Sequence, residues 1–135
     1  MKRPKKTKFG DYATWIRFEV FSSYAVRLIL TNDLTKSAKE RLGHMPADPA
    51  ADGFVFHPNE IAQSYIFLPM NPSENVIAHE AWHIVHKVMD YVGAGIDNEV
   101  VAYHLGWLVG QIYRFKNSIQ EAKNGHSRSG SKKRS

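Results

Sequence analysis

One short run of residues has the types and the spacing that metal chemistry requires: His79-Glu80-Ala81-Trp82-His83, of the form H-E-x-x-H. Residues four apart on an α-helix lie one above the other, so both imidazoles can bind a single metal ion. Glu80 lies about 100° further round such a helix, beside the open coordination position, where its carboxylate can take a proton from water. The motif therefore predicts a Zn²⁺ site with His79 and His83 as ligands and Glu80 as general base.

The helix expected around this motif has one polar and one apolar side. His86 and Asp90 share the side of the two motif histidines. His86 lies about 10 Å along the axis from His79, too far for both to bind one ion. Apolar residues cluster on the opposite side: Ile77, Ala81, Ile84, Val85, Val88 and Val92. We expect the apolar side to pack into a core; the alternative is a solvated polar face that happens to be rich in histidine.

A catalytic zinc site needs a third protein ligand, and Glu99 is the candidate that we favour. It begins the second expected long helix, sixteen residues after His83. Ala102, Gly106 and Gly110 share its side of that helix. Because an interior glycine costs about 1 kcal/mol relative to alanine, two of them indicate close approach of the helices, which would bring Glu99 toward the histidines. Helix packing alone also explains the glycines.

Asp97 and His104 are the alternative third ligands. If the first long helix continues to residue 91, Glu99 begins about 12 Å further along the axis than His83. The assignment of Glu99 then requires the first helix to end earlier or the second to cross it steeply.

The elements that position these residues are strands followed by helices. Period-two alternation predicts strands at 15–31 (one or two strands), 53–57 and 64–68. Helical periodicity predicts helices at 34–42, about 73–91 and about 98–117. Asp33 and Asp97 suit N-caps, while Gly43 and Gly93 suit the left-handed position after a helix. This order predicts an α+β fold, a small antiparallel or mixed sheet from the N-terminal half packed on a C-terminal pair of long helices.

Charge separates a central domain from two basic ends. The chain has 135 residues and a net charge of +5. Residues 1–8 and 119–135 together hold ten bases and one acid, whereas 9–118 hold eight bases and twelve acids. We expect a basic flexible arm over 1–8, one domain over 9–118 and a basic, Ser/Gly-rich disordered tail over 119–135. A basic groove on the domain itself is not expected.

Composition excludes several classes of protein. The chain has no cysteine, which excludes disulfides and thiolate metal sites. No stretch approaches the ~20 apolar residues of a membrane span. Asp11, Arg17 and Glu19 interrupt what would be the apolar core of a signal peptide. We therefore expect an intracellular protein without membrane contact.

With these motifs the chain resembles a zincin metallopeptidase of the gluzincin kind, which has H-E-x-x-H on one helix and a glutamate ligand on the next. Asn98-Glu99, followed by Ala102-Tyr103, is similar to small phage-encoded metallopeptidase-like proteins, in which this second motif closes the site. The resemblance is strong over 73–110 and covers the preceding strands in outline. It implies a minimal zincin-like fold, Zn²⁺, and hydrolysis of peptide bonds by a zinc-bound water that the motif glutamate activates.

The same resemblance implies two further roles. Tyr103, one turn beyond Glu99, can hydrogen-bond the oxyanion that forms at the scissile carbonyl; a merely packed tyrosine is the alternative. In zincins an extended substrate pairs with the free edge of a strand that lies beside the helix with the H-E-x-x-H motif. The strand at 64–68 or its neighbour is placed to be that strand. A core strand without a free edge is the alternative. We interpret His57, at the end of a strand, as a turn histidine.

Three hypotheses of function follow. The favoured one is a zinc metallopeptidase acting on a peptide or protein substrate. The second is a non-catalytic, phage-type binding module with a structural or vestigial zinc site. The third is a nucleic-acid-associated protein that uses Lys2–Lys8 and Lys123–Arg134 as weak electrostatic tethers, although such ends also simply aid solubility. The sequence does not predict an oligomeric state.

Overall fold

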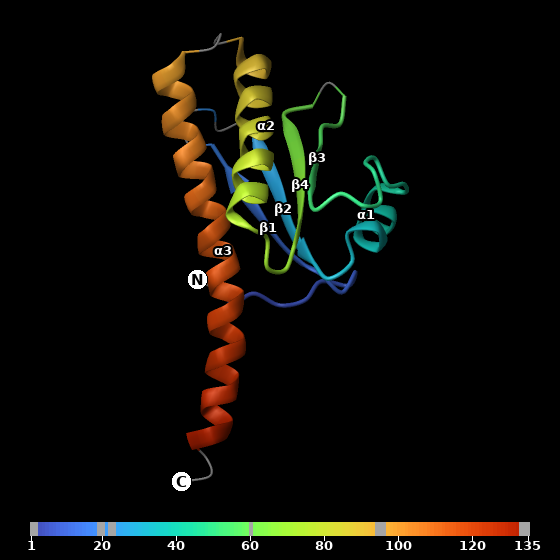
Figure 1. Cartoon of the computed structure of the whole chain (residues 1–135), viewed down its shortest axis with the longest axis vertical. Coiled ribbons are helices and arrows are strands. Elements are labelled where there is room, and N and C mark those ends of the chain that lie inside the picture. The colour runs from blue at the N-terminus through green and yellow to red at the C-terminus, as the bar shows by residue number, and fades with distance from the viewer. Residues whose placement is uncertain (1–2, 19–20, 22–23, 60, 94–96, 133–135) are drawn as a thin grey trace.

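The computed structural model describes residues 3–18, 21, 24–59, 61–93 and 97–132, with side chains through Asn124 (Figure 1). The described chain forms a four-stranded mixed sheet, three α-helices and the segments that connect them. The α+β fold expected from the sequence is confirmed. In chain order the elements are β1 Tyr12–Arg17, β2 Ala25–Thr31, α1 Leu34–Leu42, β3 Phe54–Phe56, β4 Gln63–Pro69, α2 Glu74–Val92 and α3 Asn98–Lys132.

The sheet has the strand order β1-β2-β4-β3. β1 pairs with β2 and β3 pairs with β4 in antiparallel fashion, while β2 and β4 are parallel. Strand β4 therefore has a neighbour on each side and no free edge, so of the two interpretations of 64–68 the structure confirms the core strand. Its short neighbour β3 is the edge strand on that side of the sheet.

Period-two alternation gives each face of the sheet its own apolar cluster. The face with Val26, Leu28 and Ile66 packs against α2 and α3 and forms the main core. The opposite face, with Ile29, Phe54 and Phe67, packs against α1. Figure 1 shows the resulting layers, with the two long helices on one side of the sheet. The strand expected over 15–31 is two strands, and residues 19, 20, 22 and 23 between them lie outside the described part.

Capping residues set the helix ends where the sequence predicts them. Asp33 accepts a hydrogen bond from the backbone N–H of Lys36 at the start of α1. Gly93 follows α2 at a φ of 68°, in the left-handed region. Asp97 caps α3, since its Oδ1 accepts from two backbone N–H groups of the first turn. The break expected at 93–95 falls partly on residues 94 and 95, which lie outside the described chain.

Most of the apolar side of α2 is buried. Five of the six residues predicted for it, together with Met89, have exposed fractions of 0–2%: Ile77, Ala81, Ile84, Val85 and Val88. This burial fixes the rotation of α2 about its own axis. The histidines on the other side of α2 consequently lie outside the main core.

Helix α3 is longer than the sequence predicts. We expected it to end near 117 and to give way to a disordered tail from 119, but the backbone is helical through Lys132 (Figure 1). Ile119 is 3% exposed within the main core, so the helix continues past 117 in contact with the domain. Gly125 and Gly130 cost about 1 kcal/mol each in a helix, yet no proline interrupts the segment. Residues 133–135 lie outside the described chain.

The N-terminal segment is attached to α1 by a buried ion pair. The carboxylate of Asp11 accepts hydrogen bonds from Arg41 at 2.7 and 2.8 Å and from the Ser37 hydroxyl at 2.9 Å. Burial alone raises the pKa of Asp11, but the hydrogen bonds and the charge of Arg41 outweigh burial and hold it below its ordinary value. Further toward the terminus, Arg3 and Pro4 line a cavity together with α3. Within the described residues, none of the helices is both long and apolar enough to cross a membrane.

Candidate metal centre

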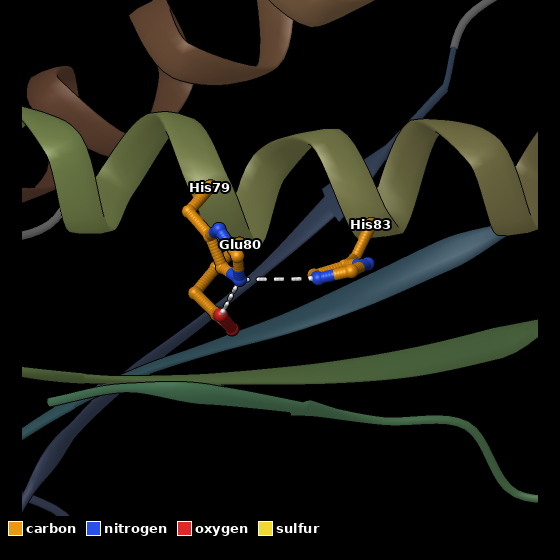
Figure 2. A group of neighbouring side chains, drawn as sticks. All are labelled: His79, Glu80 and His83. Carbon is orange, nitrogen blue, oxygen red and sulfur yellow. Dashed lines mark hydrogen bonds and ion pairs between the residues drawn. The ribbon is translucent and has the colours of Figure 1, made fainter. Parts of the chain in front are cut away.

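His79, Glu80 and His83 form one compact group on α2. The Nε2 atoms of the two histidines lie 3.2 Å apart. Glu80 Oε1 lies 3.6 Å from His79 Nε2. Figure 2 shows all three side chains leaving the helix on the side of the strands. Among the described residues, this is the group of histidine and carboxylate side chains whose atoms lie close enough together to hold a metal ion.

The side chains of this group differ in their exposure to solvent. The side chain of His79 is 69% exposed, whereas that of Glu80 is only 8% exposed. Burial raises the pKa of Glu80 above its ordinary value, and the charges of His79 and His83 oppose this shift. The group thus combines the accessible imidazole of His79 with a carboxylate of increased proton affinity.

The distance between the imidazoles fits a shared metal ion. Two nitrogens bound tetrahedrally at 2.0–2.1 Å from one zinc ion lie about 3.3 Å apart, close to the 3.2 Å between the two Nε2 atoms. Imidazole nitrogen and carboxylate oxygen are both zinc ligands in proteins. The donor set therefore fits Zn²⁺, as well as other divalent ions that bind imidazole.

The structure does not bring the expected third ligand to this group. Glu99 is exposed in the first turn of α3. Helix α2 continues to Val92, so the connection to α3 begins about 14 Å along the axis from His83. The earlier end of the first helix that would have shortened this distance is not observed.

The alternative ligands have other contacts. Asp97 caps α3. His104 is buried, with Nδ1 bonded to the Val100 carbonyl oxygen at 2.8 Å and its ring against Phe18 and Phe21. Tyr103, the expected oxyanion ligand, is 66% exposed on α3. None of these three belongs to the group around His79 and His83 within the described chain.

The glycines of α3 do not mark a helix contact. A Cβ atom added at Gly106 or Gly110 would meet no atom within 4 Å. Leu108 and Ile112, on the other side of α3, are fully buried in the main core instead. The expectation that the glycine side approaches the first long helix, taking Glu99 with it, is therefore wrong.

His57 lies at the end of a strand, as expected, and makes a contact there that its position alone does not predict. It follows β3, and its Nδ1 lies 2.7 Å from the Oγ of Ser64. Burial, followed by the positive charges of Lys87 and His83, lowers the pKa of His57 to about 4. The signal was available in the alternation, since Val55 and His57 share the sheet face that α2 covers.

Two cavities flank the histidine pair along β3. One, of about 480 Å³, is lined by His57, His83, His86, Lys87, Met89, Asp90 and Gly93. The other, of about 340 Å³, is lined by Asp52, Gly53, Asn75, Val76, His79 and Glu80. They meet β3 at its opposite ends, so together they flank the centre as a groove between β3 and α2. A larger cavity of about 730 Å³ lies between α3 and the N-terminal segment, away from these residues.

No family model, curated protein or solved structure matches this chain. The geometry of the centre is therefore the basis for a functional proposal.

Proposed function

We propose that the protein is a zinc-dependent metallopeptidase in which His79 and His83 bind the metal and Glu80 is the general base. The main support is the geometry of the centre. Two imidazole nitrogens lie at the separation that a shared zinc ion requires, and a buried carboxylate lies 3.6 Å from one of them. A structural zinc site needs ligands but no such carboxylate.

The residues of the centre divide the reaction between them. Zn²⁺ bound at the imidazoles would polarise the scissile carbonyl and lower the pKa of water. Glu80 accepts the proton of the attacking water, the carbon–nitrogen bond breaks, and Glu80 returns that proton to the leaving amine. The buried position of its carboxylate strengthens its electrostatic interactions with these groups, because little water screens them.

The groove favours an extended substrate. Among the described strands, β3 pairs with β4 alone, so its outer edge has free backbone hydrogen-bonding groups. An extended peptide can add to such an edge as a further strand. Its side chains would then reach the cavities that flank the centre on either side. A peptide bond within such a strand passes the histidine pair.

Glu99 is the third protein ligand in this proposal, on the resemblance of Asn98-Glu99 and Ala102-Tyr103 to the second motif of the phage-encoded metallopeptidase-like proteins. In the described arrangement it is exposed and apart from the histidines. Its participation therefore requires the first turn of α3 to move when metal binds.

The proposal is tested by replacing Glu80 with Gln in the full-length protein. The variant keeps the shape of the side chain and removes its base. We expect it to bind zinc as the wild type does and to lose hydrolysis of a peptide library by roughly 100-fold or more. Equal hydrolysis by both proteins contradicts the role of Glu80. Zinc binding without hydrolysis by the wild type favours the non-catalytic binding module instead.

A further inference from the structure

A chain of three hydrogen-bonding side chains runs from the core to the groove. The Tyr24 hydroxyl is hydrogen-bonded to Ser64 Oγ, which in turn lies 2.7 Å from His57 Nδ1. Tyr24 is 1% exposed and Ser64 is 0% exposed, whereas His57 is half-buried and lines the cavity that also contains His83. The chain therefore connects a fully buried phenol to the wall of the candidate active site.

The sheet register brings these residues together. Val26 lies opposite Ser64, and Tyr24 lies two positions earlier on the same face. Phe56 lies opposite Tyr65 in the antiparallel pair, so the next residue, His57, faces Ser64. All three side chains are therefore on the face that α2 covers.

The direction of the hydrogen bonds follows from the buried end of the chain. Within the described residues, Ser64 Oγ is the hydrogen-bond partner of the Tyr24 hydroxyl. Either hydroxyl can be the donor in this bond, but only donation by Tyr24 to Ser64 gives the buried phenol an acceptor for its proton within the described residues. The serine has one proton of its own, and it donates this proton to His57 Nδ1.

This direction fixes the tautomer of His57. A neutral imidazole carries one N–H, and a nitrogen that accepts a hydrogen bond cannot carry it. Nδ1 accepts from Ser64, so the proton is on Nε2. The two ring nitrogens point in divergent directions, so with Nδ1 turned to the buried serine, Nε2 is on the other side of a ring that lines the cavity. A nitrogen with its proton attached can donate a hydrogen bond but cannot bind a metal ion.

We infer that His57 donates the hydrogen bond that stabilises the oxyanion of the substrate carbonyl, with Ser64 and Tyr24 as the residues that position it. This inference rests on the proposed peptidase function. A fixed N–H donor aimed at the developing charge is the device by which acyl-transfer sites stabilise their transition states. His57 takes the role that the sequence assigned to Tyr103, and it does so from the same cavity wall as His83.

The tautomer can be measured without any activity. Long-range proton–nitrogen NMR spectra of the metal-free protein should show His57 as the Nε2–H form. Tyr24→Phe removes the buried donor, and His57 should then become a mixture of tautomers. A wild type with the proton on Nδ1, or a tautomer unaffected by Tyr24→Phe, overturns the inference and leaves the proposed function intact.

Kinetics test the catalytic role. His57→Ala should keep one zinc per chain and a wild-type KM while kcat falls by roughly 10²–10³-fold, as when an oxyanion donor is removed. His57→Gln retains an N–H donor and should recover part of the loss, which also separates chemistry from folding defects. Glu40→Ala, exposed on α1 at the opposite face of the sheet and outside both cavities, should keep the wild-type kcat.

The outcomes separate the two proposals. An unchanged kcat in His57→Ala, with hydrolysis by the wild type, contradicts the inference alone. A zinc-loaded wild type that hydrolyses no peptide contradicts the proposed function and this inference with it.

Discussion

His79 and His83 lie on successive turns of α2 with their Nε2 atoms 3.2 Å apart. The separation results from the four-residue spacing of the motif together with the rotation of the helix, which burial of its apolar side fixes. A metal ion that binds between them stabilises the folded state and not the unfolded state, because the two imidazoles are not held together in an unfolded chain.

Zinc should therefore stabilise the fold. At free zinc 100-fold above Kd, the free energy of unfolding should rise by about 2.7 kcal/mol, which corresponds to a rise in Tm of roughly 10 °C. Differential scanning calorimetry of the wild type with and without zinc measures this shift. His79→Ala should show no shift, while His86→Ala should behave as the wild type.

Glu99→Gln tests the third ligand. If the first turn of α3 moves to complete the site, loss of the carboxylate should weaken zinc binding more than about 10-fold, measured by competition with a zinc indicator. Glu121→Gln, further along α3, is the matched control and should leave the affinity unchanged. Equal affinity for Glu99→Gln and the wild type would exclude Glu99 as a ligand and leave His79 and His83 as the protein ligands of this proposal.

The open surface at Gly106 predicts a gain in stability on substitution. Gly106→Ala adds a Cβ that meets no atom within 4 Å, so it should raise the free energy of unfolding by about 0.5–1 kcal/mol through the helix propensity alone. Gly53→Ala is the contrasting variant, since its Cβ would lie 3.0 Å from Val76 Cγ1 and 3.2 Å from the Phe67 carbonyl oxygen. Urea denaturation should show Gly106→Ala as stabilised and Gly53→Ala as destabilised. A destabilised Gly106→Ala would mean that the glycine side of α3 packs against the rest of the protein.

The Asp11–Arg41 pair should make stability depend on acid pH. The pKa of Asp11 is lower in the folded chain than in the unfolded one, so its contribution is present above the unfolded value of about 3.9 and is lost as the pH falls through the folded value. Asp11→Asn leaves Arg41 unpaired and should cost about 3–5 kcal/mol at neutral pH. Denaturation between pH 7 and pH 2 should show a smaller acid loss for the variant; parallel curves would contradict the role of the pair.

Local signals in the sequence predict most of the fold and, at the candidate metal centre, the His79–Glu80–His83 group. Helix α1 begins after Asp33 and ends before Gly43, as the capping chemistry of these two residues predicts. The four-residue spacing of His79 and His83 brings their side chains together without any tertiary information. The α+β class follows from the order of the elements. What depends on one helix or one strand alone was predictable.

Relationships between elements were not predictable in this way. The place of Glu99 depends on where α2 ends and how α3 packs, and the glycines of α3 suggested the wrong contact side. The position of His57 depends on the pairing of β3 with β4 and of β4 with β2, which a single sequence does not specify. The helical continuation past 117 depends on the burial of Ile119.

Metal content is the direct test of a metal site at His79 and His83. We would measure it by mass spectrometry on the full-length protein, purified without chelator or added zinc, beside His83→Ala. We predict about one zinc per chain in the wild type and none in the variant. A folded wild type that contains no metal and binds no zinc on titration would contradict the account, because the His79–His83 pair would then not be a metal site.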